Sequence, residues 1–179
     1  ITHKLDGDVF RKKDVSTVVK LSKKKDVIVI GPGLGMNSGE FVKSIVKKCK
    51  NLVLDADALK FVCINDVKGC ILTPHSKEFE LLTGKKLPFM LNDRIKMVLK
   101  FSKENCILLK GNPDIIAYKG KYKLNFTGNK GMTVGGTGDV LAGLCSGFLA
   151  QSHDLFLSGC SAAFVNGLCG DKLFKELGY

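Results

Sequence analysis

Short runs of aliphatic and β-branched residues recur along the chain, and each run is continuously apolar rather than alternating with polar positions. Runs of this kind are typical of strands whose two faces are both covered by helices, as in a parallel sheet. The sequence therefore predicts four such strands, at Val27–Ile30, Leu52–Leu54, Cys70–Thr73 and Cys106–Leu109.

Between these runs, apolar residues recur at the spacing of amphipathic helices, which place one face on a core and the other in solvent. Asp14 and the Asn37–Ser38 pair are candidate caps for the first two helices, and Gly84 is a stop signal for the third. Strands that alternate with helices through short connections form a mainly parallel sheet with right-handed crossovers. The predicted helices cover Val15–Lys24, Gly39–Lys48, Glu78–Leu82 and Asn92–Lys103.

The pattern changes after the fourth strand. Two further strand-like segments, Asp114–Tyr118 and Tyr122–Phe126, flank a Lys-Gly-Lys turn and predict an antiparallel hairpin. Two helices follow, at Val140–Gln151 and from Leu155 to about Leu177. They carry small residues that would let them pack closely, namely Ala142, Gly143, Ser146, Gly147, Ser161, Ala162 and Ala163. No repeat or linker divides the chain, so we expect a single α/β domain over residues 1–179.

Composition and charge narrow the class of protein. A chain of 179 residues, of which 45% are apolar, can bury a core, and its apolar runs are too short to span a bilayer. The formal charge of +11 could indicate a nucleic-acid surface. The lysines, however, are interleaved with apolar residues in predicted helices, and tryptophan is absent. This favours a solvated lysine-rich face that also attracts anionic ligands, and we expect neither a nucleic-acid nor a membrane partner.

The cysteines indicate the redox compartment. There are seven of them, an odd number, and no two form a C-x-x-C pair. Most lie among apolar neighbours, which predicts buried reduced thiols and argues against a zinc site. We therefore expect the protein in a reducing cytoplasm.

The strongest local signal is the glycine-rich turn that ends at Asp139. Gly135, Gly136 and Gly138 let the chain turn sharply and aim successive N–H groups into one concavity. The concavity opens a helix, whose N-terminus carries partial positive charge and therefore suits a phosphate. Asp139 could simply cap this helix, or it could be a base that removes a proton from a hydroxyl attacking the phosphate. The three glycines around it favour the base.

Two further segments follow predicted strands. Gly31–Gly35 is a glycine-rich turn that is neither G-x-G-x-x-G nor a P-loop, so by itself it is weak evidence for a ligand. After the third strand, Pro74 is expected to start a helix that places His75 and Glu78 on one face. These two side chains could reach the same ligand, or Glu78 could only complement the helix N-terminus.

Charged residues follow the remaining strands. Lys110 could meet a phosphate, or it could belong to a solvated turn that Asp114 closes. Asp55 and Asp57 are candidates for Mg²⁺ or hydroxyl contacts, or for capping the segment after them. Because ligand sites in parallel sheets gather beyond the carboxyl ends of strands, we expect these segments to assemble one site.

Five motifs occur together and in order, and they resemble those of the ADP/ATP-dependent NAD(P)H-hydrate dehydratase family, a branch of the ribokinase-like superfamily. The Gly-Thr-Gly-Asp turn alone is shared with many kinases of that superfamily, whereas its combination with the Thr-Pro-His motif is similar to the dehydratases. The motifs are Gly31–Gly35, Asp55–Leu59, Leu72–Phe79, Leu109–Asp114 and Gly131–Gly143.

The resemblance implies a ribokinase-like, three-layer α/β/α fold with a mainly parallel sheet, an antiparallel hairpin and C-terminal helices. It also implies a repair reaction, in which the S epimer of hydrated NADH or NADPH is phosphorylated on its ring hydroxyl and then loses the phosphate. Asp139 would be the base, Glu78 would help hold Mg²⁺, and Gly35, His75 and Asp139 would contact the hydrate. The residues implied to bind ADP or ATP are Lys110, Gly111, Asn112, Pro113, Asp114, Gly135, Gly136, Thr137 and Gly138.

The resemblance also implies what surrounds this chain. Family members have a segment before the first strand and continue past the last helix, so we expect the sequence to be part of a longer protein. We expect ADP rather than ATP as donor, a homo-oligomer, and an NAD(P)H-hydrate epimerase fused to the domain or working with it. The alternative function is a ribokinase-like kinase for a vitamin precursor or a sugar.

Overall fold

The computed structural model describes residues 2–5 and 7–178, which form a six-stranded sheet with its strands in sequence order. The first four strands are parallel to one another, and the last two complete an antiparallel hairpin beside β4. The predicted mainly parallel sheet with a hairpin is therefore confirmed. The strands are β1 (Ile28–Ile30), β2 (Leu52–Leu54), β3 (Cys70–Leu72), β4 (Cys106–Leu109), β5 (Asp114–Tyr118) and β6 (Lys121–Asn125).

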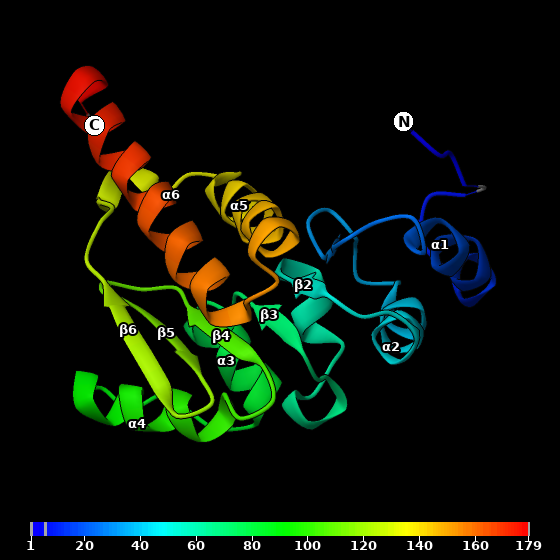
Figure 1. Ribbon diagram of the computed structural model, residues 1–179, viewed down its shortest axis with the longest axis horizontal. Helices are drawn as coiled ribbons and strands as arrows, with labels where there is room; N and C mark the ends of the chain where they lie inside the picture. Colours follow the sequence, from blue (N-terminus) through cyan, green and yellow to red (C-terminus); the bar gives the residue numbers. More distant parts are fainter. Residues whose placement is uncertain (1, 6, 179) are drawn as a thin grey trace.

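Helices cover both faces of the sheet and complete three layers (Figure 1). One face is covered by α2 to α4, with α1 packed against α2, and the opposite face by α5 and α6, which pack against each other. The helices are α1 (Val15–Ser22), α2 (Gly39–Lys48), α3 (Ser76–Thr83), α4 (Leu91–Phe101), α5 (Thr137–Ser152) and α6 (Leu155–Leu177). No helix in residues 2–5 and 7–178 is both long and apolar enough to cross a membrane.

The continuously apolar strands contribute side chains to two separate hydrophobic cores. Successive side chains of a strand point to opposite faces, so Leu52 and Leu54 join the core under α2 and α3 whereas Val53 joins the core under α5 and α6. All three residues of β2 are fully buried. This two-sided burial is the physical reason that the strands lack an alternating pattern.

Several predicted helix ends differ in the structure. The carboxylate of Asp14 accepts from the Arg11 N–H, and the hydroxyl of Ser38 donates to the Leu34 carbonyl, so neither side chain caps the α-helix that follows it. Helix α3 begins at Ser76 rather than at Pro74 or Glu78. Its expected end is confirmed, because Gly84 adopts the left-handed conformation directly after the helix.

The small residues of the last two helices divide into two groups. Ala142, Ala162 and Ala163 are buried in the core between these helices and the sheet, as expected. Gly143 and Gly147 lie instead on the exposed side of α5, where an added Cβ would meet no described atom within 4 Å. The expectation that these two glycines bring the helices together was therefore wrong.

Gly31 shows how closely the backbone segments approach after β1 and β2. Its φ is +133°, and an added Cβ would run into the carbonyl oxygen of Asp55. Gly33 in the same turn has a φ of +66° and open space around it. Only Gly31 is therefore required both by its backbone conformation and by a close contact.

We expect Gly31→Ala to lower the free energy of unfolding by more than about 3 kcal/mol, because it adds a backbone clash to a conformation that only glycine adopts readily. Gly33→Ala is the matched control and should cost about 1 kcal/mol, the cost of a left-handed alanine. Urea unfolding of both variants measures the difference. Equal losses of stability would contradict the close approach.

Candidate nucleotide-binding and catalytic site

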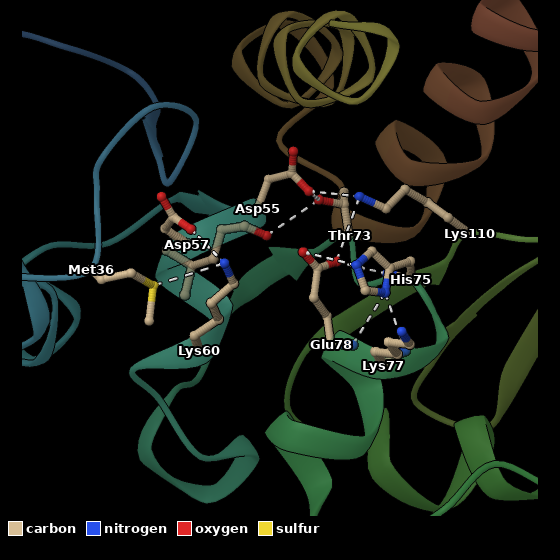
Figure 2. Close-up of polar contacts among 10 residues, drawn as sticks. Met36, Asp55, Asp57, Lys60, Thr73, His75, Lys77, Glu78 and Lys110 are labelled. Atoms are coloured by element: carbon tan, nitrogen blue, oxygen red, sulfur yellow. Dashed lines mark hydrogen bonds and ion pairs between the residues drawn. The ribbon is translucent and has the colours of Figure 1, made fainter. Parts of the chain in front are cut away.

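The carboxyl ends of the parallel strands bring polar side chains from distant parts of the sequence together (Figure 2). Asp55 follows β2, Thr73 follows β3 and Lys110 follows β4. The Asp55 Oδ1 atom accepts from the Thr73 hydroxyl at 2.7 Å and from Lys110 Nζ at 2.9 Å. Three of the strand ends that were expected to assemble one site therefore meet at one place.

Asp55 is only 2% exposed, so its charge depends on these partners. Lys110 Nζ also lies 3.8 Å from Glu78 Oε2, so two carboxylates flank one ammonium group. The Lys110 side chain is 25% exposed. The ammonium is therefore held in a fixed place while part of it stays accessible to a ligand.

His75 and Glu78 form the N-terminal cap of α3. Nδ1 of His75 accepts from the backbone N–H groups of Lys77 and Glu78, and Glu78 Oε2 accepts from the His75 N–H at 2.8 Å. This reciprocal arrangement is a capping box, so the structural interpretation of Glu78 holds. Because the same carboxylate flanks Lys110, Glu78 also belongs to the charged cluster.

Asp57 lies in a second cluster, apart from Asp55 in Figure 2. Its carboxylate accepts from the backbone N–H of Gly35 at 2.9 Å and from Lys60 Nζ at 2.7 Å. The hydrogen bond from Lys60, and then that from Gly35, hold the pKa of Asp57 below its usual value, although desolvation opposes them. Asp57 therefore fixes the glycine-rich turn after β1, a role that the sequence did not indicate.

Helix α5 begins at Thr137, three residues earlier than expected. Its N-cap is Gly136, which has a φ of +93° and no side chain, and Asp139 is the third residue of the helix. Within residues 2–5 and 7–178, the exposed carboxylate of Asp139 makes no hydrogen bond or ion pair. The side-chain cap that was an alternative interpretation of Asp139 is therefore absent from the described structure.

The N-terminus of α5 lies against the Asp55–Lys110 ion pair. A Cβ added to Gly138 would be 3.7 Å from Asp55 Oδ2 and 3.8 Å from Lys110 Nζ. The first N–H groups of a helix have no partner within the helix and carry partial positive charge. Together with the Lys110 ammonium, they make this point of the structure suitable for an anion.

A cavity of about 490 Å³ opens beside this point, and its size suits a nucleotide. Four predicted nucleotide-binding residues after β4 form one wall, and Thr137 and Gly138 form another part. Pro113 lines a smaller neighbouring cavity of about 300 Å³ instead. The remaining predicted site residues, Gly35, His75, Glu78, Gly135, Gly136 and Asp139, are not among the residues that line the larger cavity. The four residues of the first wall are Lys110, Gly111, Asn112 and Asp114.

Asp114 stabilises the turn that carries this wall. It accepts from the Gly111 N–H at 2.9 Å and from Asn125 Nδ2 at 3.0 Å. Burial raises the pKa of the Asp114 carboxyl, although the hydrogen bonds from Asn125 and Gly111 oppose this effect. Its contacts are those of the residue that closes the turn, which was the alternative interpretation for this segment.

The opposite wall is the loop of residues 127–133, and the sequence did not predict that this loop is fastened to α6. Asp171 of α6 accepts from the Gly128 N–H and from Asn129 Nδ2, both at 2.9 Å. These hydrogen bonds, that from Asn129 first, hold the pKa of Asp171 below its usual value. A Cβ added to Gly170 would run into Met132, so α6 and the loop are in close contact. No spacing along the sequence connects residues so far apart.

Comparison with known proteins gives one consistent result. A family model described as NAD(P)H-hydrate dehydratase matches residues 1–179. The bifunctional NAD(P)H-hydrate repair enzyme Nnr of Methanocaldococcus jannaschii is 40% identical, over 100% of this chain and 35% of its own length. An ADP-dependent (S)-NAD(P)H-hydrate dehydratase of Cenarchaeum symbiosum is 38% identical, over 82% of this chain and 54% of its own length. The chain thus spans about a third to a half of these relatives.

Solved structures agree with the observed fold. The ADP/ATP-dependent NAD(P)H-hydrate dehydratase of Bacillus subtilis, co-crystallised with ATP and Mg²⁺, superimposes with a TM-score of 0.72 at 32% identity. The match covers 86% of this chain and 57% of that one. A ribokinase-like superfamily protein of Enterococcus faecalis gives a TM-score of 0.77 at 29% identity, over 91% of this chain and 61% of that one. The chain has the ribokinase-like fold and belongs to the NAD(P)H-hydrate dehydratase family.

Proposed function

We propose that the protein uses ADP or ATP to dehydrate the S epimer of hydrated NADH or NADPH. The observation that carries the proposal is the position of Gly138, where the N-terminus of α5 meets the Asp55–Lys110 pair beside a nucleotide-sized cavity. This arrangement offers a phosphate both backbone N–H groups and an ammonium. The free carboxylate of Asp139 follows one residue later, where a base is needed.

The proposed reaction has two steps, which are phosphorylation of the hydrate and elimination of phosphate. Asp139 takes the proton from the ring hydroxyl of the hydrate while the hydroxyl oxygen attacks the terminal phosphoryl group of the nucleotide. The N–H groups of α5 and the Lys110 ammonium stabilise the negative charge that develops on that group. As the new phosphorus–oxygen bond forms, the bond from the terminal phosphorus to its bridging oxygen breaks and the shortened nucleotide leaves. In the second step the carbon–oxygen bond breaks, phosphate leaves with the bonding electrons, and a proton passes from the neighbouring ring carbon to water, which restores the double bond of the dihydronicotinamide ring. Phosphorylation thus turns a poor leaving group, hydroxide, into a good one.

The residues present also fit a Mg²⁺ ion. No group of three or more His, Cys, Asp or Glu side chains in the described part of the chain is arranged to hold a metal. Mg²⁺ usually takes one or two protein carboxylates and completes its shell with water and nucleotide phosphates. Glu78 and Asp55, which flank Lys110, could supply such carboxylates, and the ion would supply further charge neutralisation at the phosphates.

The proposal also covers the nucleotide donor, an accompanying enzyme activity, the cellular location and the oligomeric state. Two archaeal relatives are named as ADP-dependent, which supports ADP as donor. Several relatives are named as bifunctional repair enzymes, which supports an epimerase activity accompanying this one. All seven cysteines are free, which supports the reducing cytoplasm proposed as the location. We also propose a homo-oligomer that acts without a nucleic-acid or membrane partner.

The direct test is recovery of dihydronicotinamide absorbance after the protein, Mg²⁺ and ADP or ATP are added to purified NADH hydrate. We expect recovery that requires a nucleotide and releases one phosphate per ring restored. The more effective nucleotide identifies the donor. A stable phosphorylated product in place of recovered absorbance would contradict the proposal and would indicate a small-molecule kinase.

Replacing Asp139 tests the proposed base. We expect Asp139→Asn to lower turnover by about 10²- to 10⁴-fold, because the amide cannot accept the hydroxyl proton, while nucleotide affinity is retained. Asp93→Asn is a matched control, because Asp93 is also the third, exposed residue of its helix. Steady-state kinetics with NADH hydrate measure both variants. Unchanged turnover in Asp139→Asn would exclude this role.

Gly138→Val tests the anion site without straining the backbone, because Gly138 lies within a helix. The added methyl groups would lie between the helix N-terminus and Lys110, so we expect ADP affinity to fall by at least about tenfold. Gly147→Val makes the same change on the exposed side of α5 and should leave the affinity unchanged. Calorimetric titration with ADP distinguishes the two variants. Equal affinities would contradict the anion site.

A further inference from the structure

Asn166 on α6 lines the larger cavity and is half-buried. Within residues 2–5 and 7–178, its side-chain amide makes no hydrogen bond. Other polar side chains of the same wall are occupied, since Asn129 bonds to Asp171 and Thr127 bonds to Asn125 and to the Phe164 carbonyl. No side-chain nitrogen or oxygen in the described residues is both buried and without a hydrogen bond, so the unbonded Asn166 amide is still accessible to a ligand that enters the cavity.

Three apolar side chains line the same cavity as this amide. Leu141 and Ala163 line it and are themselves almost fully buried. Met132 contributes a polarisable thioether from the loop, and Gly167 contributes no side chain. Apolar surface together with an amide that has no partner favours a flat heteroaromatic ring, which needs apolar contact on its faces and hydrogen bonds along one edge.

Different parts of the cavity suit different parts of a nucleotide. Gly138 and Lys110 form the part that suits a phosphate, and Leu141 lies one turn further along the same side of α5. Ala163, Asn166 and Gly167 line the cavity from α6, which packs against α5. A nucleotide with its phosphates at Gly138 would therefore have its base on the side of α6.

We propose that Asn166 is the residue that selects the base of the nucleotide donor, and that it selects adenine. Its Nδ2 would donate to a ring nitrogen of the base, and its Oδ1 would accept from the exocyclic amino group beside that nitrogen. Adenine presents such an acceptor next to a donor, whereas guanine presents two acceptors on the corresponding edge and leaves Oδ1 unpaired. This inference rests on the proposed function only in placing a nucleotide in the cavity.

Three ligands separate base recognition from phosphate binding: ADP, GDP and inorganic pyrophosphate, which has no base. We expect the unmodified protein to bind ADP more tightly than GDP. Asn166→Leu keeps the size of the side chain and removes both hydrogen-bonding groups, so ADP affinity should fall by about 10- to 100-fold. The ratio of ADP to GDP affinity should then approach one, whereas pyrophosphate affinity should not change.

Asn92→Leu, on the exposed first turn of α4, is the matched control and should leave all three affinities unchanged. An unchanged ratio of ADP to GDP affinity in Asn166→Leu would overturn the inference. An equal loss of pyrophosphate affinity would also overturn it, because the residue would then act on the structure of the whole cavity. The dehydratase assay is a separate readout: selective ADP binding without hydrate turnover would contradict the proposed function but would support the role of Asn166.

Discussion

The ion pair between Lys110 and the buried carboxylate of Asp55 is the interaction on which the site depends. Asp55 follows β2, bonds to Thr73 after β3, and holds the ammonium that follows β4. Three neighbouring strands are therefore tied together at the edge where their connecting loops meet. A carboxylate that is 2% exposed would be costly without these partners, so the contacts constrain the strand ends as well as the charge.

The N-terminus of helix α5 lies at the same point and forms the second part of the site. A Cβ added to Gly138 would make ordinary contacts with both members of the ion pair, so the first turn of the helix lies directly against them. The positive ammonium and the helix N-terminus then act on one small volume, and Asp139 follows Gly138 in the same turn of the helix. Helix α6 and the loop fastened to it by Asp171 extend this volume into a cavity that can hold a whole nucleotide.

Much of the fold could be predicted because the spacing of apolar residues along a segment depends on whether the segment forms a strand or a helix. The segments Leu52–Leu54, Cys106–Leu109 and Asp114–Tyr118 are strands with the expected bounds, since apolar runs of this length have few other stable conformations. Helix caps were less predictable, because α1 and α2 begin at the expected Val15 and Gly39 whereas the side chains of Asp14 and Ser38 do not cap them. A polar side chain near a helix start can bond to several backbone groups, and the choice among them depends on the geometry of the turn before the helix.

The sequence by itself determined the order of strands and helices, the glycine-rich turn at the start of α5, and the charged residues that follow the strands. These features depend on periodicity, on glycine's backbone freedom and on the rule that parallel strands share their carboxyl edge. Only the tertiary structure decided that Asp57 holds Gly35, that Glu78 both caps α3 and flanks Lys110, and that α6 forms a wall of the cavity. Those contacts join residues far apart in the chain, and they depend on how the helices pack across two cores, which no local pattern specifies.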